Sequence, residues 1–307
     1  MTIYSQAPTR ISLFGGGTDL PVYSNRFGGM VISMAINIYQ RFFLGDEKGE
    51  WETISNNKNF YETIFKQVGY LPNKFHQDFD GPIESGLGSS ASCAVGRIAA
   101  ATRLKEVRLT REEIAEKAWD IEVNKLKMYG GKQDQYAAAY GGMNIIYFKE
   151  TVQVDPFERW RSEKLTDNLM LFYVGSVRED TKIQEELLVL DQDKINSLHT
   201  LKEIAEAAIG YLWTANWPKV ADLLDSSWHY KKLSNPKISN EKIDEIYTKA
   251  KEAGARGGKL CGSGGGGHMI FMASPEKQGD VTRELTNMGC TPVDYSIDWN
   301  GVTTKFL

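Results

Sequence analysis

The sequence predicts a two-domain α+β protein. Its 307 residues suffice for about two domains. Strand-like runs of β-branched and aromatic residues occur with helical patterns in both halves, and the polar stretch "RWRSEKLTDN" separates the halves. We therefore expect one domain over residues 1–162 and a second over residues 163–307.

The first forty residues predict a strand, a loop and a strand. "RISLF" precedes the glycine loop "GGGTDLP", and the apolar run "GMVISMAINIYQRFFLG" follows it. The later segment "NNKNFYETIFKQVGY" predicts a helix, after which "FHQDFDGPIE" leads into a second loop, "SGLGSSAS".

Two helices and two strands complete the first half. From Ser89 onward, small and apolar residues recur at helical spacing, namely Ala91, Ala94, Val95 and Ile98. Thr110 and Glu113 form a capping box at the start of "TREEIAEKAWDIEVNKL", and Glu122 lies beside the apolar stripe of that helix. "MNIIYFKE" and "VQVDPF" have the composition of strands.

The second half begins with the strand "LMLFYVG" and continues through a long, interrupted helical region. "SNEKIDEIYTKAKEA" predicts a helix with Asn240 as N-cap and Gly254 at its end. "GGKLCGSGGGGHMIFMA" predicts a strand, a glycine loop and a strand, followed by the helix "SPEKQGDVTRELTNM" and the strand "TPVDYSI".

Charge and composition argue against several classes of partner. A formal net charge of −4 and a pI of about 5.7 disfavour nucleic acid and anionic membranes. The N-terminus has no apolar signal core, and the sequence has no apolar run of about 18 residues, so we expect a cytoplasmic protein. Cys93, Cys261 and Cys290 are expected to be free thiols, and the four histidines show no metal-ligand spacing.

Three glycine-rich loops are candidate binding sites, although none is a Walker A, GxGxxG or GxSxG motif. "SGLGSS" at a helix start can hold a phosphate on free amides, or it can simply be a turn that starts the helix. "CGSGGGG" is either a flexible hairpin or a wrapping for a polar ligand. In "FGGGTDLP", Asp19 is either a turn former or a ligand contact.

The three loops and their order resemble the GHMP kinases, a family that includes galactokinase, homoserine kinase and mevalonate kinase. "GLGSSAS" is similar to the motif that wraps the ATP phosphates, and "GGKLCGSGGGG" to the third motif. "APTRISLFGGGTDLPVY", "GGKQDQYAAAYGG" and "GARGGKLCGSGGGG" most resemble D-glycero-D-manno-heptose 7-phosphate kinases. The resemblance implies a two-lobed fold with a ribosomal-S5-domain-2-like first lobe and a ferredoxin-like second lobe.

The resemblance also implies roles for individual residues. ATP would be bound by Gly86, Leu87, Gly88, Ser89, Ser90 and Ala91. The sugar would be bound by Gly16, Gly17, Thr18, Asp19, Gly264 and Gly265. Asp134 would face the acceptor hydroxyl, Arg10 would lie near the transferring group, and Ser90 with Glu122 would hold Mg²⁺. The alternatives are a helix cap for Asp134, a solvated helix residue for Glu122 and a surface cation on a strand edge for Arg10.

The implied reaction is ATP-dependent phosphorylation of the anomeric hydroxyl of D-glycero-D-manno-heptose 7-phosphate, in the synthesis of nucleotide-activated heptose. The distal phosphate of that acceptor needs a further cation, for which the candidates are Lys132, Arg178 and Lys232. Glu84 replaces the glycine usual before the phosphate loop, so we expect it to point away from the phosphates or to pair with a cation.

Two alternatives remain at this point. The chain could be another sugar kinase, similar to galactokinase or fucokinase, or a non-catalytic sugar-phosphate sensor with the same fold. The expected partners are small molecules, with neither nucleic acid nor membrane among them, and a homodimer is compatible with the resemblance.

Overall fold

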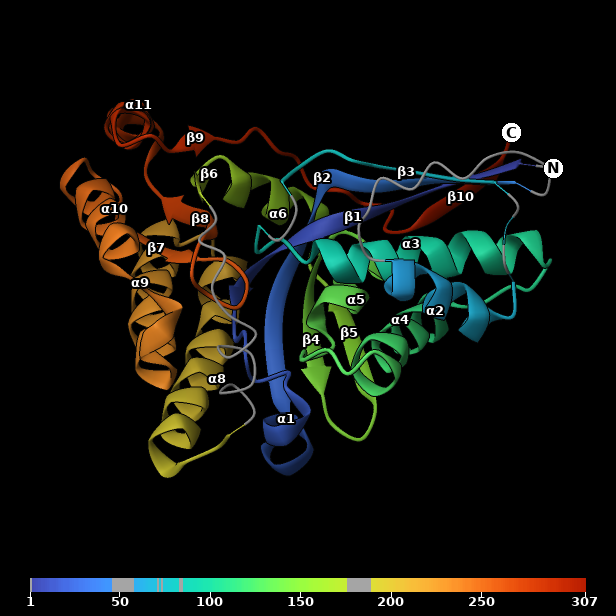
Figure 1. Ribbon diagram of the computed structural model, residues 1–307. Coiled ribbons are helices and arrows are strands. Elements are labelled where there is room, and N and C mark those ends of the chain that lie inside the picture. Colours follow the sequence, from blue (N-terminus) through green and yellow to red (C-terminus); the bar gives the residue numbers. More distant parts are fainter. Residues whose placement is uncertain (1, 46–57, 71, 73, 83–84, 176–188) are drawn as a thin grey trace.

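A computed structural model describes residues 2–45, 58–70, 72, 74–82, 85–175 and 189–307, and it has two lobes (Figure 1). The first lobe contains a six-stranded antiparallel sheet in the order β10-β1-β2-β4-β5, with β3 also paired to β2. Its strands are β1 Thr2–Phe14, β2 Gly29–Gly45, β3 Lys74–Phe79, β4 Met143–Phe148, β5 Val152–Pro156 and β10 Thr303–Phe306.

The helices of the first lobe lie mainly on one face of this sheet (Figure 1). They are α1 Pro21–Phe27, α2 Lys58–Val68, α3 Ser89–Leu104, α4 Arg111–Trp119 and α5 Gln133–Tyr140, and α4 runs into a π-helical turn, η1, at Asp120–Lys125. Val31 of β2 packs in one hydrophobic cluster with α3 and α5, whereas Met30 and Ile32 pack in another. The first half of β2 is therefore buried on both faces, which explains its mostly apolar sequence, in which Ser33 is a polar residue.

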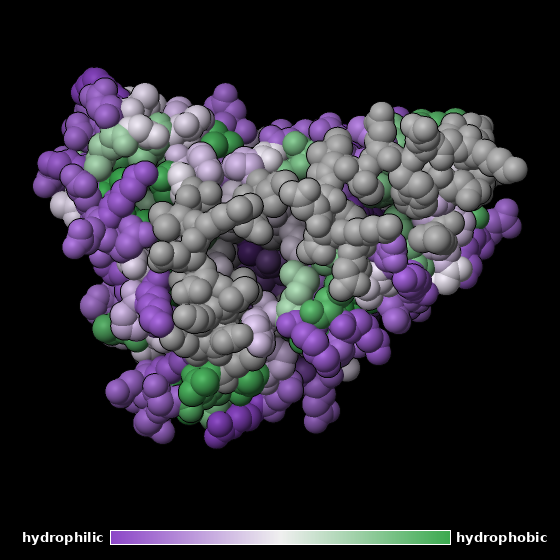
Figure 2. All heavy atoms as spheres, in the orientation of Figure 1, coloured by the Kyte–Doolittle hydropathy of each residue, from purple (hydrophilic) through white to green (hydrophobic). Residues whose placement is uncertain are grey.

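The second lobe contains a four-stranded antiparallel sheet in the order β7-β8-β6-β9. Its strands are β6 Leu169–Gly175, β7 Gly257–Leu260, β8 Gly267–Met272 and β9 Thr291–Pro292. The helices are α6 Arg159–Thr166, α8 Gln192–Trp213, α9 Trp217–Ser234, the 3₁₀ turn η2 Pro236–Ile238, α10 Glu241–Glu252 and α11 Pro275–Asn287. Hydrophilic side chains gather over α10 in the space-filling view, as expected for a solvent-facing helix (Figure 2).

The α+β fold class and most element predictions are confirmed. The run predicted as the second strand is β2 from end to end. The capping box forms, because the Thr110 side chain accepts from Glu113 N and the Glu113 carboxylate accepts from Thr110 N. Asn240 caps α10 by accepting from Ile243 N at 3.0 Å. No helix among the described residues is long and apolar enough to cross a membrane.

The prediction of a strand over "TPVDYSI" is largely wrong. Only Thr291–Pro292 forms a strand, paired to β6, and Ile297 then forms an isolated bridge to Ile36 of the other sheet. The segment therefore passes from one sheet to the other, which a strand-like composition cannot reveal. Sequence analysis also missed β10, which pairs with β1 and returns the chain end to the first lobe. Helix α6 spans the predicted boundary at residues 162 and 163, and that division stays a prediction.

Candidate active site

The loop "SGLGSS" at residues 85–90, called the first glycine loop from here on, brings main-chain atoms next to strand β1. Gly86 and Gly88 have φ angles of +81° and +72°, in the region that side chains other than glycine rarely adopt. Between them, Leu87 is buried and its carbonyl accepts from Arg10 N at 2.9 Å. Helix α3 begins directly after Gly88, at Ser89, so its first N–H groups lie beside β1.

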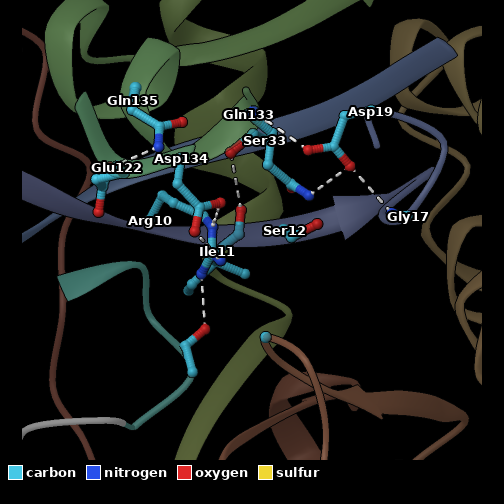
Figure 3. A network of polar contacts seen from close by, with 12 residues as sticks. Arg10, Ile11, Ser12, Gly17, Asp19, Ser33, Glu122, Gln133, Asp134 and Gln135 are labelled. Atoms are coloured by element: carbon cyan, nitrogen blue, oxygen red, sulfur yellow. Dashed lines mark hydrogen bonds and ion pairs between the residues drawn. The ribbon is translucent and has the colours of Figure 1, made fainter. Parts of the chain in front are cut away.

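Arg10 and Asp134 form a two-pronged ion pair at the centre of the site (Figure 3). Arg10 Nε donates to Asp134 Oδ1 at 2.7 Å and Nη2 donates to Oδ2 at 2.8 Å, while Nη1 donates to the Gly86 carbonyl at 2.6 Å. Arg10 is only 4% exposed, whereas the Asp134 side chain is 26% exposed. A Cβ on Gly88 would lie 3.1 Å from Asp134 Oδ2 and 3.3 Å from Arg10 Cζ, so the loop backbone lies directly against the pair.

Glu122 lies on one side of this pair, in contact with the start of α3 (Figure 3). Ser90 Oγ donates to Glu122 Oε1 at 2.6 Å and Gln135 Nε2 donates to Oε2 at 2.7 Å. The π-helical turn, in which Leu126 N donates to Ile121 O, carries Glu122 into the interior rather than onto the flank of its helix. Burial raises the pKa of the Glu122 carboxyl to about 7, against the opposing effect of the two hydrogen bonds.

Asp19 lies on the other side of the pair and joins two loops (Figure 3). Its carboxylate accepts from Gly17 N at 3.1 Å, from Gln133 Nε2 at 3.0 Å and from Gln133 N at 3.3 Å. Burial, together with the charge of Asp134, raises the pKa of Asp19. A Cβ on Gly131 would lie 1.9 Å from Asp19 Oδ2, so this close approach requires glycine. Gly16 and Thr18 belong to the same loop, and Thr18 Oγ1 donates to the Gly15 and Met30 carbonyls.

The loop between β7 and β8, "CGSGGGG" at residues 261–267, is called the second glycine loop from here on. It packs against the first glycine loop. A Cβ on Gly262 would lie 2.6 Å from Gly86 Cα, and one on Gly267 would lie 2.3 Å from the Ser85 carbonyl. Gly264 and Gly265 lie over η2, where Gly265 N donates to Ile238 O at 3.0 Å. The two loops come from different lobes, so the site is formed between the lobes. A hollow with hydrophilic residues at its bottom is visible near the middle of Figure 2.

The candidate cations for a distal phosphate have other partners where the structure describes them. Lys132 Nζ lies 2.7 Å from Glu116 Oε2 and over the Trp119 ring, and Lys232 Nζ lies 2.9 Å from Asp244 Oδ1. The structure does not bring either lysine into the network of Figure 3. Arg178 and Glu84 lie outside the described residues.

Sequence analysis missed several residues of the site, namely Gly131, Gln133, Gln135, Lys231 and Lys259. One signal was available for Lys231. It lies three, four and seven residues after the buried Trp228, Ser227 and Leu224 of α9, so helical periodicity places it in the middle of the inner face, whereas Lys232 lies at the edge of that face, over the Trp228 ring. The choice of Lys232 from the same lysine pair ignored that periodicity.

The residues present fit a magnesium ion. Among the described residues there is no group of three or more His, Cys, Asp or Glu that could form a complete metal cage. A single buried carboxylate beside a serine hydroxyl is nevertheless the donor set that Mg²⁺ uses when phosphate oxygens and water supply the other ligands. Glu122 and Ser90 form that pair.

Comparisons with known proteins agree with this geometry. The family description "GHMP kinases N terminal domain" matches residues 57–142, and "GHMP kinases C terminal" matches residues 204–289. A D-glycero-alpha-D-manno-heptose 7-phosphate kinase from Campylobacter jejuni is 30% identical over 98% of both chains. A mevalonate kinase from Pyrococcus abyssi is 29% identical over 72% of this chain and 65% of its own length.

A solved structure shows the same fold. The crystal structure of a D-glycero-D-manno-heptose 1-phosphate kinase from Bacteroides thetaiotaomicron has a TM-score of 0.80, with 24% identity over 99% of both chains. Two lobes with paired glycine loops and an Arg–Asp pair between them thus define an ATP-dependent kinase of small molecules. The chain belongs to the GHMP kinase family.

Proposed function

We propose that the protein transfers the γ-phosphoryl group of ATP to the anomeric hydroxyl of D-glycero-D-manno-heptose 7-phosphate, giving the 1,7-bisphosphate. The observation that carries the chemistry is the Arg10–Asp134 pair, which lies against Gly88 of the first glycine loop. The choice of acceptor is supported by the full-length similarity to the Campylobacter jejuni heptose 7-phosphate kinase.

The first glycine loop would hold the phosphates of ATP. Glycine at positions 86 and 88 allows close approach of the backbone, and the first N–H groups of α3 favour negative charge. Phosphoryl transfer depends mainly on positioning and on charge stabilisation, so a rigid loop next to Arg10 suits this chemistry.

Asp134 would accept the proton of the attacking hydroxyl while the new O–P bond forms and the bond to ADP breaks. Arg10 holds Asp134 in place through two of its five N–H groups and holds Gly86 through a third. None of the hydrogen bonds within the described part of the chain uses the remaining two N–H groups of Arg10, which could donate to the oxygens of the transferring phosphoryl group.

Glu122 and Ser90 would hold Mg²⁺ on the side of the pair away from Asp19 (Figure 3). When bound, the ion would neutralise negative charge on the phosphates. Asp19 and its loop would face the sugar from the opposite side, so that Asp134 would stand between donor and acceptor. We infer this order because Glu122, Asp134 and Asp19 follow one another in that order across Figure 3.

Steady-state kinetics with ATP and three acceptors test the proposal: heptose 7-phosphate, free heptose and galactose. A charge-assisted contact to the distal phosphate is worth about 1.5–3 kcal/mol, so we expect kcat/KM to be roughly 10–200-fold higher for the phosphorylated heptose. Phosphorus NMR of the product should place the new phosphate on the anomeric oxygen. Equal kcat/KM for phosphorylated and free sugars would reject the acceptor, and absence of turnover with all three would favour a sensor.

A further inference from the structure

Two lysines that the proposed mechanism does not use lie beneath the glycine loops. Lys259 of β7 is 2% exposed, and its Nζ donates to the Ser12 and Leu13 carbonyls of β1 at 3.0 and 3.1 Å. Lys231 of α9 is partly exposed as a whole residue, but its amine lies inside the protein. That amine donates to the Leu260 carbonyl at 3.1 Å and to the Gly262 carbonyl at 2.6 Å.

The two amines and Arg10 form a group of cations with little opposing charge. Within the described part of the chain, both lysines bond to carbonyl oxygens only, and the carboxylate of Asp134 is already paired with Arg10. The charged or titratable groups that act on Lys231 are Lys259 on β7, Arg10 on β1 and the thiol of Cys261 after β7. Burial, followed by the charge of Lys259, lowers the pKa of Lys231 to about 7.

Lys231 is connected to the reacting pair through the backbone of the two glycine loops. It holds the Gly262 carbonyl, and Gly262 packs against Gly86 so closely that no side chain fits between them. The Gly86 carbonyl in turn accepts from Arg10 Nη1, and Arg10 holds Asp134. A shift of Gly262 would therefore reach Arg10 through one packed contact and one hydrogen bond.

We propose that Lys231 is a positioning residue for phosphoryl transfer: its ammonium fixes the second glycine loop against the first, and bound nucleotide phosphates stabilise the charged form of its amine. A nearby anion favours the protonated form of an amine. Binding of ATP slightly above neutral pH should then be accompanied by uptake of protons at Lys231. The proposal rests on the ATP-dependent kinase activity of the family, not on the identity of the sugar.

The test compares Lys231→Arg and Lys231→Met with the wild type. Calorimetric titration of ATP with MgCl₂, in two buffers of different ionisation enthalpy, gives the number of protons bound per nucleotide. Arginine keeps a charge that cannot be removed, so Lys231→Arg should take up fewer protons than the wild type, by about half a proton, while keeping kcat/KM for ATP within about tenfold. Lys231→Met should lose the same uptake and about 10–100-fold in kcat/KM.

Lys105→Met is the control, because Lys105 also donates to two backbone carbonyls, those of Val68 and Gly69, at the end of α3 opposite to the first glycine loop. It should retain the proton uptake and kcat/KM of the wild type.

Thermal unfolding of every variant checks folding, and if Lys231→Met does not fold, Lys231→Arg alone decides the matter. Wild-type proton uptake in Lys231→Arg, or wild-type ATP affinity and kcat/KM in a folded Lys231→Met, would overturn the proposal. Because nucleotide binding needs no acceptor, failure of the heptose assay would leave the calorimetric results, proton uptake and ATP affinity, unaffected.

Discussion

Replacing Asp134 by asparagine tests the central pair with little change in shape. The carboxylate accepts two hydrogen bonds from Arg10, at 2.7 and 2.8 Å. Asparagine keeps one acceptor oxygen, but its NH₂ group would face an N–H group of Arg10. One hydrogen bond is thus lost and two donors oppose each other.

The expected loss of stability is moderate. Removing one member of a fully buried ion pair costs about 3–5 kcal/mol. Since the Asp134 side chain is 26% exposed, water can reach it, and we expect a cost of about 1–3 kcal/mol. The free energy of unfolding can be measured by urea denaturation.

The loss of activity should be much larger than the loss of stability suggests. An amide cannot accept the proton of the acceptor hydroxyl, so kcat should fall by about 10²–10⁴-fold. The affinity for ATP, measured by calorimetry without acceptor, should stay within about threefold because Asp134 does not belong to the phosphate loop. A coupled assay of ADP release measures kcat.

Asp222→Asn is a matched control. Asp222 also accepts two hydrogen bonds from one arginine, Arg256, at 2.7 and 3.0 Å, but that pair lies on the surface of the second lobe. Its kcat should equal that of the wild type. A near-wild-type kcat in Asp134→Asn, or an equal loss in both variants, would refute the role given to Asp134.

Two further predictions concern the sides of the site. Gly131→Ala would place a methyl group 1.9 Å from Asp19 Oδ2, so it should raise KM for the sugar by about tenfold or more while KM for ATP changes little. Gly130→Ala, where a Cβ has nothing within 4 Å, should leave both KM values unchanged, and equal effects at the two positions would contradict the prediction. Glu122→Gln should raise the MgCl₂ concentration for half-maximal rate by about 10-fold or more, since a neutral amide is a weaker ligand for Mg²⁺. An unchanged dependence of the rate on MgCl₂ would show that Glu122 is not a ligand of Mg²⁺.

The sequence by itself determined the elements whose cause is local. The mostly apolar run of β2 and the Thr110–Glu113 capping box depend on residues close together in the chain, so pattern alone located them. The three glycine loops were found in the same way, and their order indicated the family before any contact was known.

Only the tertiary structure decided which residues meet. Arg10 and Asp134 are 124 positions apart, and their pairing depends on α5 packing against β1 next to the first glycine loop. The carboxylate of Asp19 likewise accepts a hydrogen bond from the side chain of Gln133, 114 positions away. No local pattern encodes such contacts, because they result from the packing of whole elements.

The two adjacent lysines of α9 show which information comes from the sequence and which comes only from the tertiary structure. Lys231 and Lys232 are identical in type and adjacent, yet one amine bonds the glycine-loop backbone and the other bonds Asp244. A step of one residue turns the side chain by about 100° around a helix. Helical periodicity could tell which lysine points inward, but only the packing of α9 against β7 decided that the inward one reaches the Gly262 carbonyl.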